Sequence, residues 1–232
     1  MVEFLAFCGK NRVGKTTLAD SFSGMVGLST VISFADPLRD ELEAIYGLPA
    51  SLVRAPSIDK NSILVTFGDY DFTPEAPELW YKHGLISHKE DFASMTVTLR
   101  EVFVNHATPI RRAEDEGYWL KQFVEKADQM SRDYDIIVVD DTRFDNEFEY
   151  LLTKQAKFIE VTNDSNPESD VAQHSATRWL AANQDKLSGH IHAPIPLSRQ
   201  IADQLNREMI PRLFSNLQSV SGLEISNITR RC

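Results

Sequence analysis

The segment Gly9–Thr16 constrains this chain more than any other, because it reads Gly-Lys-Asn-Arg-Val-Gly-Lys-Thr. It fits the pattern G-x-x-x-x-G-K-[ST], in which two glycines let the backbone curl so that successive N–H groups point at a phosphate chain. Lys15 is placed to reach the β and γ phosphates of a nucleotide, and Thr16 to offer its hydroxyl to Mg²⁺. The residues expected to bind the nucleotide are Gly9, Asn11, Arg12, Val13, Gly14, Lys15, Thr16 and Thr17.

The residues on both sides of this loop support the interpretation. Residues 2–8 are mostly apolar and predict a β-strand that runs into the loop. After it, Leu18, Phe22 and Met25 recur at helical spacing, and the start of such a helix adds the positive end of its dipole to the phosphate site. The motif therefore predicts a bound nucleotide, without fixing the reaction.

Length and composition narrow the class of protein. A chain of 232 residues buries a good core, and we expect a single domain over 1–232. Its formal net charge of −10 argues against non-specific binding to nucleic acid or to an anionic membrane. Two cysteines are too few for a disulfide framework, and no apolar run approaches the ~20 residues that span a bilayer.

These features predict where the protein works. The residues before the first predicted strand do not have the pattern of a signal peptide, in which a charged segment is followed by an apolar one. We therefore expect a soluble, cytoplasmic protein without a membrane partner, in the cytoplasm of the host cell if the chain is viral. Nothing in the sequence supports an oligomer.

Strands and helices are predicted to alternate along most of the chain. Short apolar or β-branched runs predict strands, and apolar positions at helical spacing predict helices between them. Such alternation predicts an α/β fold with a doubly wound parallel sheet flanked by helices, whose ligands sit at the carboxyl ends of the strands. After the first strand and helix, the predicted strands are 29–34, 134–139 and 157–161, and the predicted helices are 36–46, 98–106, 117–132 and 145–155.

The pattern predicts secondary structure less clearly in two regions, 50–95 and 198–217. Between residues 50 and 95 the pattern breaks up into a short strand near 62–67 and an acidic, proline-bearing loop over 69–77. This region is compatible with a segment that covers substrate and equally with a plain surface excursion. Residues 198–217 predict an amphipathic helix that is broken or kinked near Pro211 and packs against the sheet.

A pair of acidic residues, Asp140 and Asp141, ends the strongly apolar strand 134–139. A phosphate-binding loop needs a carboxylate at the end of a neighbouring strand to organise Mg²⁺, and these residues stand where one is expected. An aspartate at this position also suits the N-cap of the next helix. The pattern alone leaves open which of the two organises the metal.

Three further blocks, 34–39, 117–121 and 141–147, resemble segments of the bacteriophage deoxynucleoside monophosphate kinases. They read Phe-Ala-Asp-Pro-Leu-Arg, Gly-Tyr-Trp-Leu-Lys and Asp-Thr-Arg-Phe-Asp-Asn-Glu, and with the loop they follow the family's order across about residues 1–163. The resemblance implies a P-loop nucleoside monophosphate kinase fold. In that fold a core binds ATP, an inserted region (here about 36–116) binds the acceptor, and a lid (here about 164–188) closes over both.

The resemblance also implies roles for single residues. Asp36 is expected to face the acceptor and orient or deprotonate it, although it also suits the N-cap of its helix. Arg143 is expected to clamp a phosphate, because a guanidinium fork matches phosphoryl oxygens. Asp141, rather than Asp140, aligns with the family's aspartate. Weaker candidates for phosphate contacts are Arg39, Arg111, Arg112 and Arg178.

The chain departs from the family near its end. The lid region keeps a histidine, His174, without the glutamate that follows it in the family. The last strand carries His190 and His192 in place of an Asn-Asp-Gly element. Without a cysteine or a third ligand nearby, these two histidines predict strand residues that point to one face rather than a metal site.

Three functions follow. The first is an ATP- and Mg²⁺-dependent kinase that phosphorylates a deoxynucleoside monophosphate, a small-molecule partner. The second is a related phage kinase that phosphorylates the hydroxymethyl group of 5-hydroxymethyluracil within DNA during base hypermodification, for which Arg54, Arg111 and Arg112 would line a groove. The third is a nucleotide-dependent binding or switch protein with slow hydrolysis, although the chain lacks a guanine-reading N-K-x-D motif.

Overall fold

The computed structural model describes residues 2–10, 12–55, 59–164 and 175–214. These residues form two compact units, one made of residues 1–33 and 127–232 and the other of residues 34–126. The second unit contains the predicted acceptor-binding insertion, about 36–116, whose role stays a prediction. Among the described residues, no helix is both long and apolar enough to cross a bilayer.

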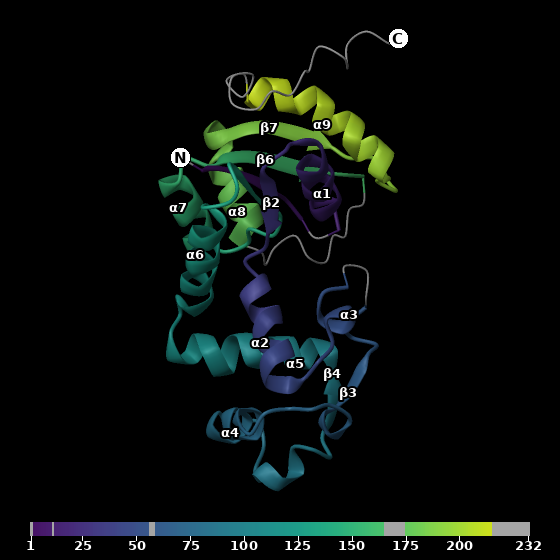
Figure 1. Ribbon diagram of the computed structural model, residues 1–232, viewed down its shortest axis with the longest axis vertical. Coiled ribbons are helices and arrows are strands. Elements are labelled where there is room, and N and C mark those ends of the chain that lie inside the picture. Colours follow the sequence, from purple (N-terminus) through teal and green to yellow (C-terminus); the bar gives the residue numbers. More distant parts are fainter. Residues whose placement is uncertain (1, 11, 56–58, 165–174, 215–232) are drawn as a thin grey trace. The chain divides into compact units, whose positions relative to one another are not determined.

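The first unit is built on a five-stranded sheet in the order β2-β5-β1-β6-β7 (Figure 1). Every neighbouring pair of these strands is parallel. Parallel strands need crossover connections, and the helices between them supply these on both faces of the sheet. The strands are β1 (Glu3–Cys8), β2 (Ser29–Ile32), β5 (Ile136–Val139), β6 (Lys157–Thr162) and β7 (Leu187–His192), and the helices are α1 (Lys15–Met25), α7 (Asp145–Thr153), α8 (Ser175–Ala182) and α9 (Arg199–Leu213).

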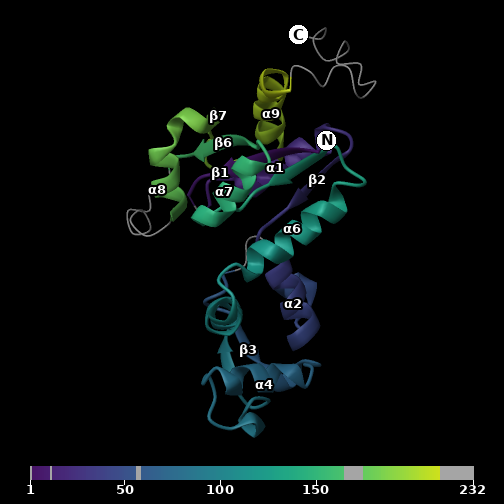
Figure 2. The same cartoon turned by 90° about the vertical axis from the view of Figure 1, so that its left-hand side faces the viewer.

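Helices cover both faces of this sheet (Figures 1 and 2). One apolar cluster joins α1 and α9 to the side of the sheet that carries Ile159 and Val161. On the other side, the ring of Phe148 on α7 stacks on the ring of Trp179 on α8, with 4.0 Å between their centroids. The ring centroid of Phe158 on β6 lies 5.3 Å from that of Trp179. The predicted doubly wound α/β fold is confirmed.

The second unit has its own core, in which aromatic side chains dominate. Tyr46, Phe67, Trp80 and Phe92 are fully buried in it. The rings of Phe67 and Phe92 stack with 4.2 Å between their centroids. Its elements are α2 (Asp36–Tyr46), α3 (Ala50–Val53), β3 (Leu64–Thr66), α4 (Glu75–Lys82), β4 (Thr96–Thr98), α5 (Leu99–Asn105), the π-helix η3 (His106–Arg112) and α6 (Tyr118–Met130), whose last residues belong to the first unit.

Most predicted elements are confirmed within a few residues, and the differences have local causes. The predicted loop 69–77 is wrong at its end, because α4 begins at Glu75. Pro77 is tolerated there because it falls in the first helical turn. The short strand predicted near 62–67 is β3, which pairs with β4 in an antiparallel two-stranded sheet. The tail helix continues through Pro211 to Leu213, and residues 215–217 of the prediction lie outside the described residues.

Candidate functional site

The phosphate-binding loop connects β1 to α1, and both of its glycines have positive φ, +136° at Gly9 and +95° at Gly14. A Cβ on Gly9 would lie 2.2 Å from the carbonyl oxygen of Val161, and one on Gly14 would lie 2.6 Å from Leu197 Cδ2. Backbone from β6 and a side chain from the segment before α9 therefore press against the loop. Only glycine fits at these two positions without displacing them.

Lys15 closes the loop on itself. Its Nζ donates hydrogen bonds to the carbonyl oxygens of Gly9 at 3.0 Å and Lys10 at 2.6 Å. Burial, together with the positive charge of Arg143, lowers the pKa of Lys15 to about 8, against the opposing effect of Asp140 and Asp141. An ammonium group desolvated in this way gains when an anion replaces the lost water. Lys15 is thus held where a bound phosphate chain would meet it.

Thr16 contacts the carboxylate that ends the neighbouring strand. Thr16 Oγ1 donates to Asp140 Oδ2 at 2.6 Å, and Ser33 Oγ donates to Asp140 Oδ1 at 2.6 Å. Asp140 is 5% exposed, so its carboxylate is fixed by these contacts. Sequence analysis missed Ser33, although β2 and β5 place Ile32 opposite Val139, which brings the next residues of both strands together.

These oxygens suit a magnesium ion. Mg²⁺ prefers oxygen ligands and is usually held by one or two protein groups together with phosphate and water. Thr16 and Asp140 provide such a hydroxyl and carboxylate at the carboxyl end of the sheet. Within the described part of the chain, no group of three or more His, Cys, Asp or Glu side chains could hold a metal ion by itself. The donor set therefore fits a metal that arrives with a nucleotide.

Arg143 follows the carboxylates in the loop before α7, and its side chain is exposed. The loop is fixed by Glu147, which is buried and accepts hydrogen bonds at Oε2 from the backbone N–H of Arg143 at 2.7 Å and of Phe144 at 3.1 Å. Glu147 thus stabilises the helix start. Its contacts leave the Arg143 guanidinium at the surface, close enough to Lys15 to affect its pKa.

The remaining predicted nucleotide residues fall into three groups. Asn11 lies outside the described residues. Arg12 has a φ of +61°, and its carbonyl oxygen accepts a hydrogen bond from Asn163 Nδ2 at 3.3 Å. Val13 is buried, whereas Thr17 is half-buried in the first turn of α1. Arg178, the predicted lid arginine, is exposed on α8.

The acceptor candidates Asp36 and Arg39 belong to the second unit. The N-cap of α2 is Ala35, so the prediction that Asp36 caps this helix is wrong by one residue. Asp36 Oδ1 instead lies 2.8 Å from Arg39 Nη1 and 3.8 Å from Arg54 Nη1, and Oδ2 lies 3.6 Å from Lys126 Nζ. Three cations therefore surround one carboxylate at the start of α2.

Arg111 is tied to acidic side chains of its own unit. Its Nε lies 2.7 Å from Glu41 Oε2, and its Nη2 lies 3.2 Å from Glu75 Oε1. Glu41 also contacts Tyr118 and the fully buried His106, whose Nε2 lies 2.7 Å away. These hydrogen bonds hold the pKa of Glu41 below its usual value even though burial opposes them. The charge of Arg111 is largely used within this network, which weakens it as a phosphate ligand; Arg112 is half-buried beside it.

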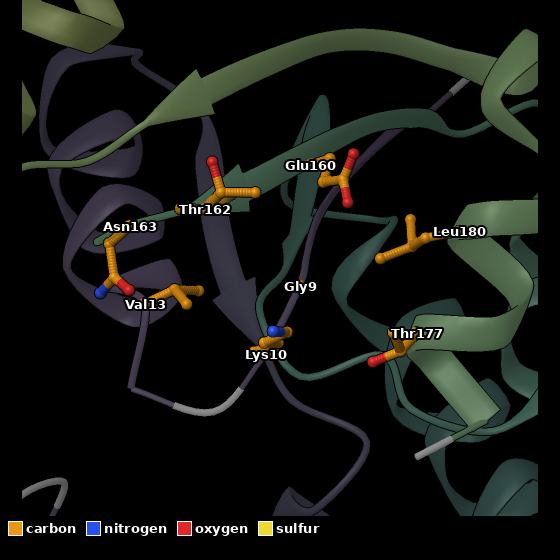
Figure 3. A pocket seen from close by; sticks show the side chains of 9 residues that line it. Gly9, Lys10, Val13, Glu160, Thr162, Asn163, Thr177 and Leu180 are labelled. Carbon is orange, nitrogen blue, oxygen red and sulfur yellow. The ribbon is translucent and has the colours of Figure 1, made fainter. Parts of the chain in front are cut away.

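A pocket of about 240 Å³ lies beside the phosphate-binding loop (Figure 3). Its walls come from Gly9, Lys10 and Val13 of the loop, from β6 and the residues after it, and from Thr177 and Leu180 of α8. The structure thus brings Lys15, Thr16, Asp140 and Arg143 together at the carboxyl end of one sheet, with a pocket next to them. His190 and His192 are exposed on β7 on either side of buried Ile191, which confirms that they point to one face.

A parallel doubly wound sheet with this loop, this lysine and this hydroxyl–carboxylate pair defines a phosphotransferase of the P-loop kinase class. Residues 98–187 match the family model described as deoxynucleotide monophosphate kinase. This match confirms the predicted resemblance to that family over these residues; the family's activity is the ATP-dependent phosphorylation of deoxynucleoside monophosphates. The matched residues include Asp140 and Arg143 but not the phosphate-binding loop, so the loop and the family match are independent observations.

Two other comparisons add little. No curated protein matches the chain. Among solved structures, an unliganded sugar kinase from Janibacter sp. HTCC2649 aligns with 13% identity over 92% of this chain and 95% of the other, with a TM-score of 0.39. A similarity of this size does not show a common fold.

Proposed function

We propose that this protein transfers the γ-phosphoryl group of ATP to a deoxynucleoside monophosphate in a Mg²⁺-dependent reaction. The observation that carries the proposal is the 2.6 Å contact between Thr16 Oγ1 and Asp140 Oδ2 at the mouth of the phosphate-binding loop. It joins the two oxygen groups that hold magnesium in P-loop kinases. The family match over residues 98–187 supports the acceptor class.

On the donor side, the chain provides charge and position rather than covalent chemistry. Backbone N–H groups of the loop and the start of α1 would bind the phosphate oxygens. Lys15 would leave the carbonyl oxygens of Gly9 and Lys10 to contact the β and γ phosphates, and Arg143 would neutralise charge that develops during transfer. Thr16 and Asp140 would hold Mg²⁺, which would supply positive charge next to the phosphate oxygens.

On the acceptor side, Asp36 and Arg39 are the best candidates. Arg39 Nε is buried and has no hydrogen-bond partner among the residues that the structure describes, and its Nη1 contacts Asp36. An arginine with a donor to spare next to a carboxylate suits a nucleotide that offers both a phosphate and hydroxyl groups. The predicted lid over about 164–188 would exclude water, since otherwise ATP is merely hydrolysed. Of this range, residues 165–174 lie outside the described structure.

Transfer of label from γ-labelled ATP tests this proposal directly. The protein is incubated with Mg²⁺, labelled ATP and, separately, each deoxynucleoside monophosphate or DNA that contains 5-hydroxymethyluracil. Label in a deoxynucleoside diphosphate supports the proposal, and the same reaction without Mg²⁺ should give none. Label in DNA alone would instead assign the acceptor to polymeric substrate, and free phosphate alone would show a hydrolase.

A further inference from the structure

Glu160 places a carboxylate in the wall of the pocket beside the phosphate-binding loop (Figure 3). Two side chains contact the same oxygen of this carboxylate. His190 Nδ1 lies 3.0 Å and Gln184 Nε2 lies 3.4 Å from Oε2. Among the described residues, Oε1 has no hydrogen-bond partner. The side chain is 20% exposed, so this free oxygen is partly withdrawn from water.

The rest of the pocket suits a flat ring. Val13 and Leu180 give it apolar walls, and the Thr177 hydroxyl is a further polar group. Because Gly9 and Lys10 line the pocket as well, it adjoins the loop in which the phosphates would lie. A nucleotide bound with its phosphates in the loop would therefore have this pocket beside it for its base.

We propose, building on the function proposed above, that this pocket takes the base of the nucleotide donor and that Glu160 selects adenine by accepting a hydrogen bond from the exocyclic amine through Oε1. A base with a keto oxygen at the same position would bring two hydrogen-bond acceptors together, because the carboxylate oxygen is an acceptor as well. The repulsion between them disfavours the binding of such a base. Guanine offers two adjacent donors, but pairing both would require Oε2, which His190 and Gln184 already occupy. One free oxygen thus fits the single amine of adenine.

The test compares the binding of Mg-ATP with that of Mg-inosine triphosphate, in which a keto oxygen replaces the amine. Dissociation constants are measured by titration calorimetry on the full chain without any acceptor, so that catalysis plays no part. The wild-type protein is expected to bind ATP at least about tenfold more tightly, the size of one charged hydrogen bond. In Glu160→Gln the preference should fall by about tenfold, because the amide can donate to the keto oxygen.

Two further variants make the result specific. Glu160→Ala should weaken the binding of ATP and leave the binding of the inosine nucleotide unchanged or tighter, because the carboxylate that repels the keto oxygen is gone. Asp185→Asn removes a charge from an exposed residue outside the pocket and should leave the preference intact, and thermal unfolding checks that each variant folds. An unchanged preference in both Glu160 variants, or equal binding of the two nucleotides by the wild type, would overturn this inference alone. If the wild type bound neither nucleotide, the donor site of the proposed function would fail with it.

Discussion

Thr16 Oγ1 donates a 2.6 Å hydrogen bond to Asp140 Oδ2, although 124 positions separate the two residues in the chain. The contact singles out Asp140 from its neighbour Asp141, which the family resemblance had favoured. Asp140 is 5% exposed and is held on its other oxygen by Ser33, whereas Asp141 is only half-buried. The two adjacent carboxylates therefore offer a matched test of the metal site.

Asp140→Asn should raise the Mg²⁺ concentration needed for half-maximal phosphoryl transfer by roughly tenfold or more, because it removes one of the two protein groups proposed to hold the metal. Asp141→Asn should change that concentration by less than about threefold. Steady-state rates over a magnesium titration would measure both effects. The reverse ranking of the two variants would move the metal to Asp141.

Lys15→Met should reduce phosphoryl transfer by roughly 10²- to 10³-fold, the usual cost of losing one group that stabilises the charge of a transition state. The fold should persist, because within the described part of the chain the Lys15 ammonium donates hydrogen bonds only to two backbone carbonyl oxygens of its own loop. Label transfer from ATP and thermal unfolding would be measured side by side. A variant with full activity would remove the loop from the donor site.

The affinity for Mg-ATP should depend on pH through Lys15. The pKa of this side chain is lowered from 10.5 to about 8, so in the nucleotide-free protein the ammonium loses its proton as the pH rises through about 8. Affinity should therefore be highest below this pH and fall above it, since only the charged form attracts phosphate. Calorimetric titrations at about pH 7 and pH 9 would show the fall. In Lys15→Arg, which keeps its charge, the fall should disappear.

Asp36→Asn should lower kcat/KM for the deoxynucleoside monophosphate by at least about tenfold, while the dissociation constant of Mg-ATP stays unchanged. The reason is the proposed role of Asp36 in orienting the acceptor. Asp40→Asn is the matched control, because Asp40 contacts Arg54 and Lys126 of the same group of cations but is 51% exposed. Equal losses in both variants would indicate a purely electrostatic effect of the lost charge.

Asn206→Ala should lower the free energy of unfolding by about 1–3 kcal/mol. Asn206 is fully buried on α9, and its Nδ2 donates to the carbonyl oxygen of Leu18 and to Ser21 Oγ of α1, both at 2.9 Å. Truncation would remove both of these buried hydrogen bonds. Urea unfolding would measure the loss, with Gln200→Ala on the exposed side of the same helix as a control of nearly no effect.

Sequence patterns predicted the first unit well, because its loop and strands are determined mainly by residues that are close together in the sequence. The loop 9–16 specifies its own turns through glycine, and the continuous apolar run 136–139 is typical of a strand covered on both faces. The position of Asp140 against Thr16 also follows from where neighbouring strands end. The choice between Asp140 and Asp141 could not be made in this way, because it depends on the direction in which each side chain leaves the strand.

The second unit was harder to predict because its structure depends on contacts between distant residues. Strands β3 and β4 have three residues each and are stabilised by pairing with each other rather than by a pattern of their own. The buried network of Glu41 and His106 joins α2 to the π-helix η3 across 65 positions of the chain. A glutamate and a histidine so far apart carry no local signal, and the same holds for Glu160, which the sequence presents as an ordinary strand residue.

The packing of α9 against α1 has a consequence for how the protein is made. The helix that follows the phosphate-binding loop rests on residues 199–213, which a ribosome adds some 180 positions later, as in the pair Leu18 and Asn206. Until that stretch has emerged, one flank of α1 keeps its apolar residues in water. We therefore expect the nucleotide site to form only after residues 199–213 have been synthesised. A chain that stops before these residues would be a target for chaperones or proteases.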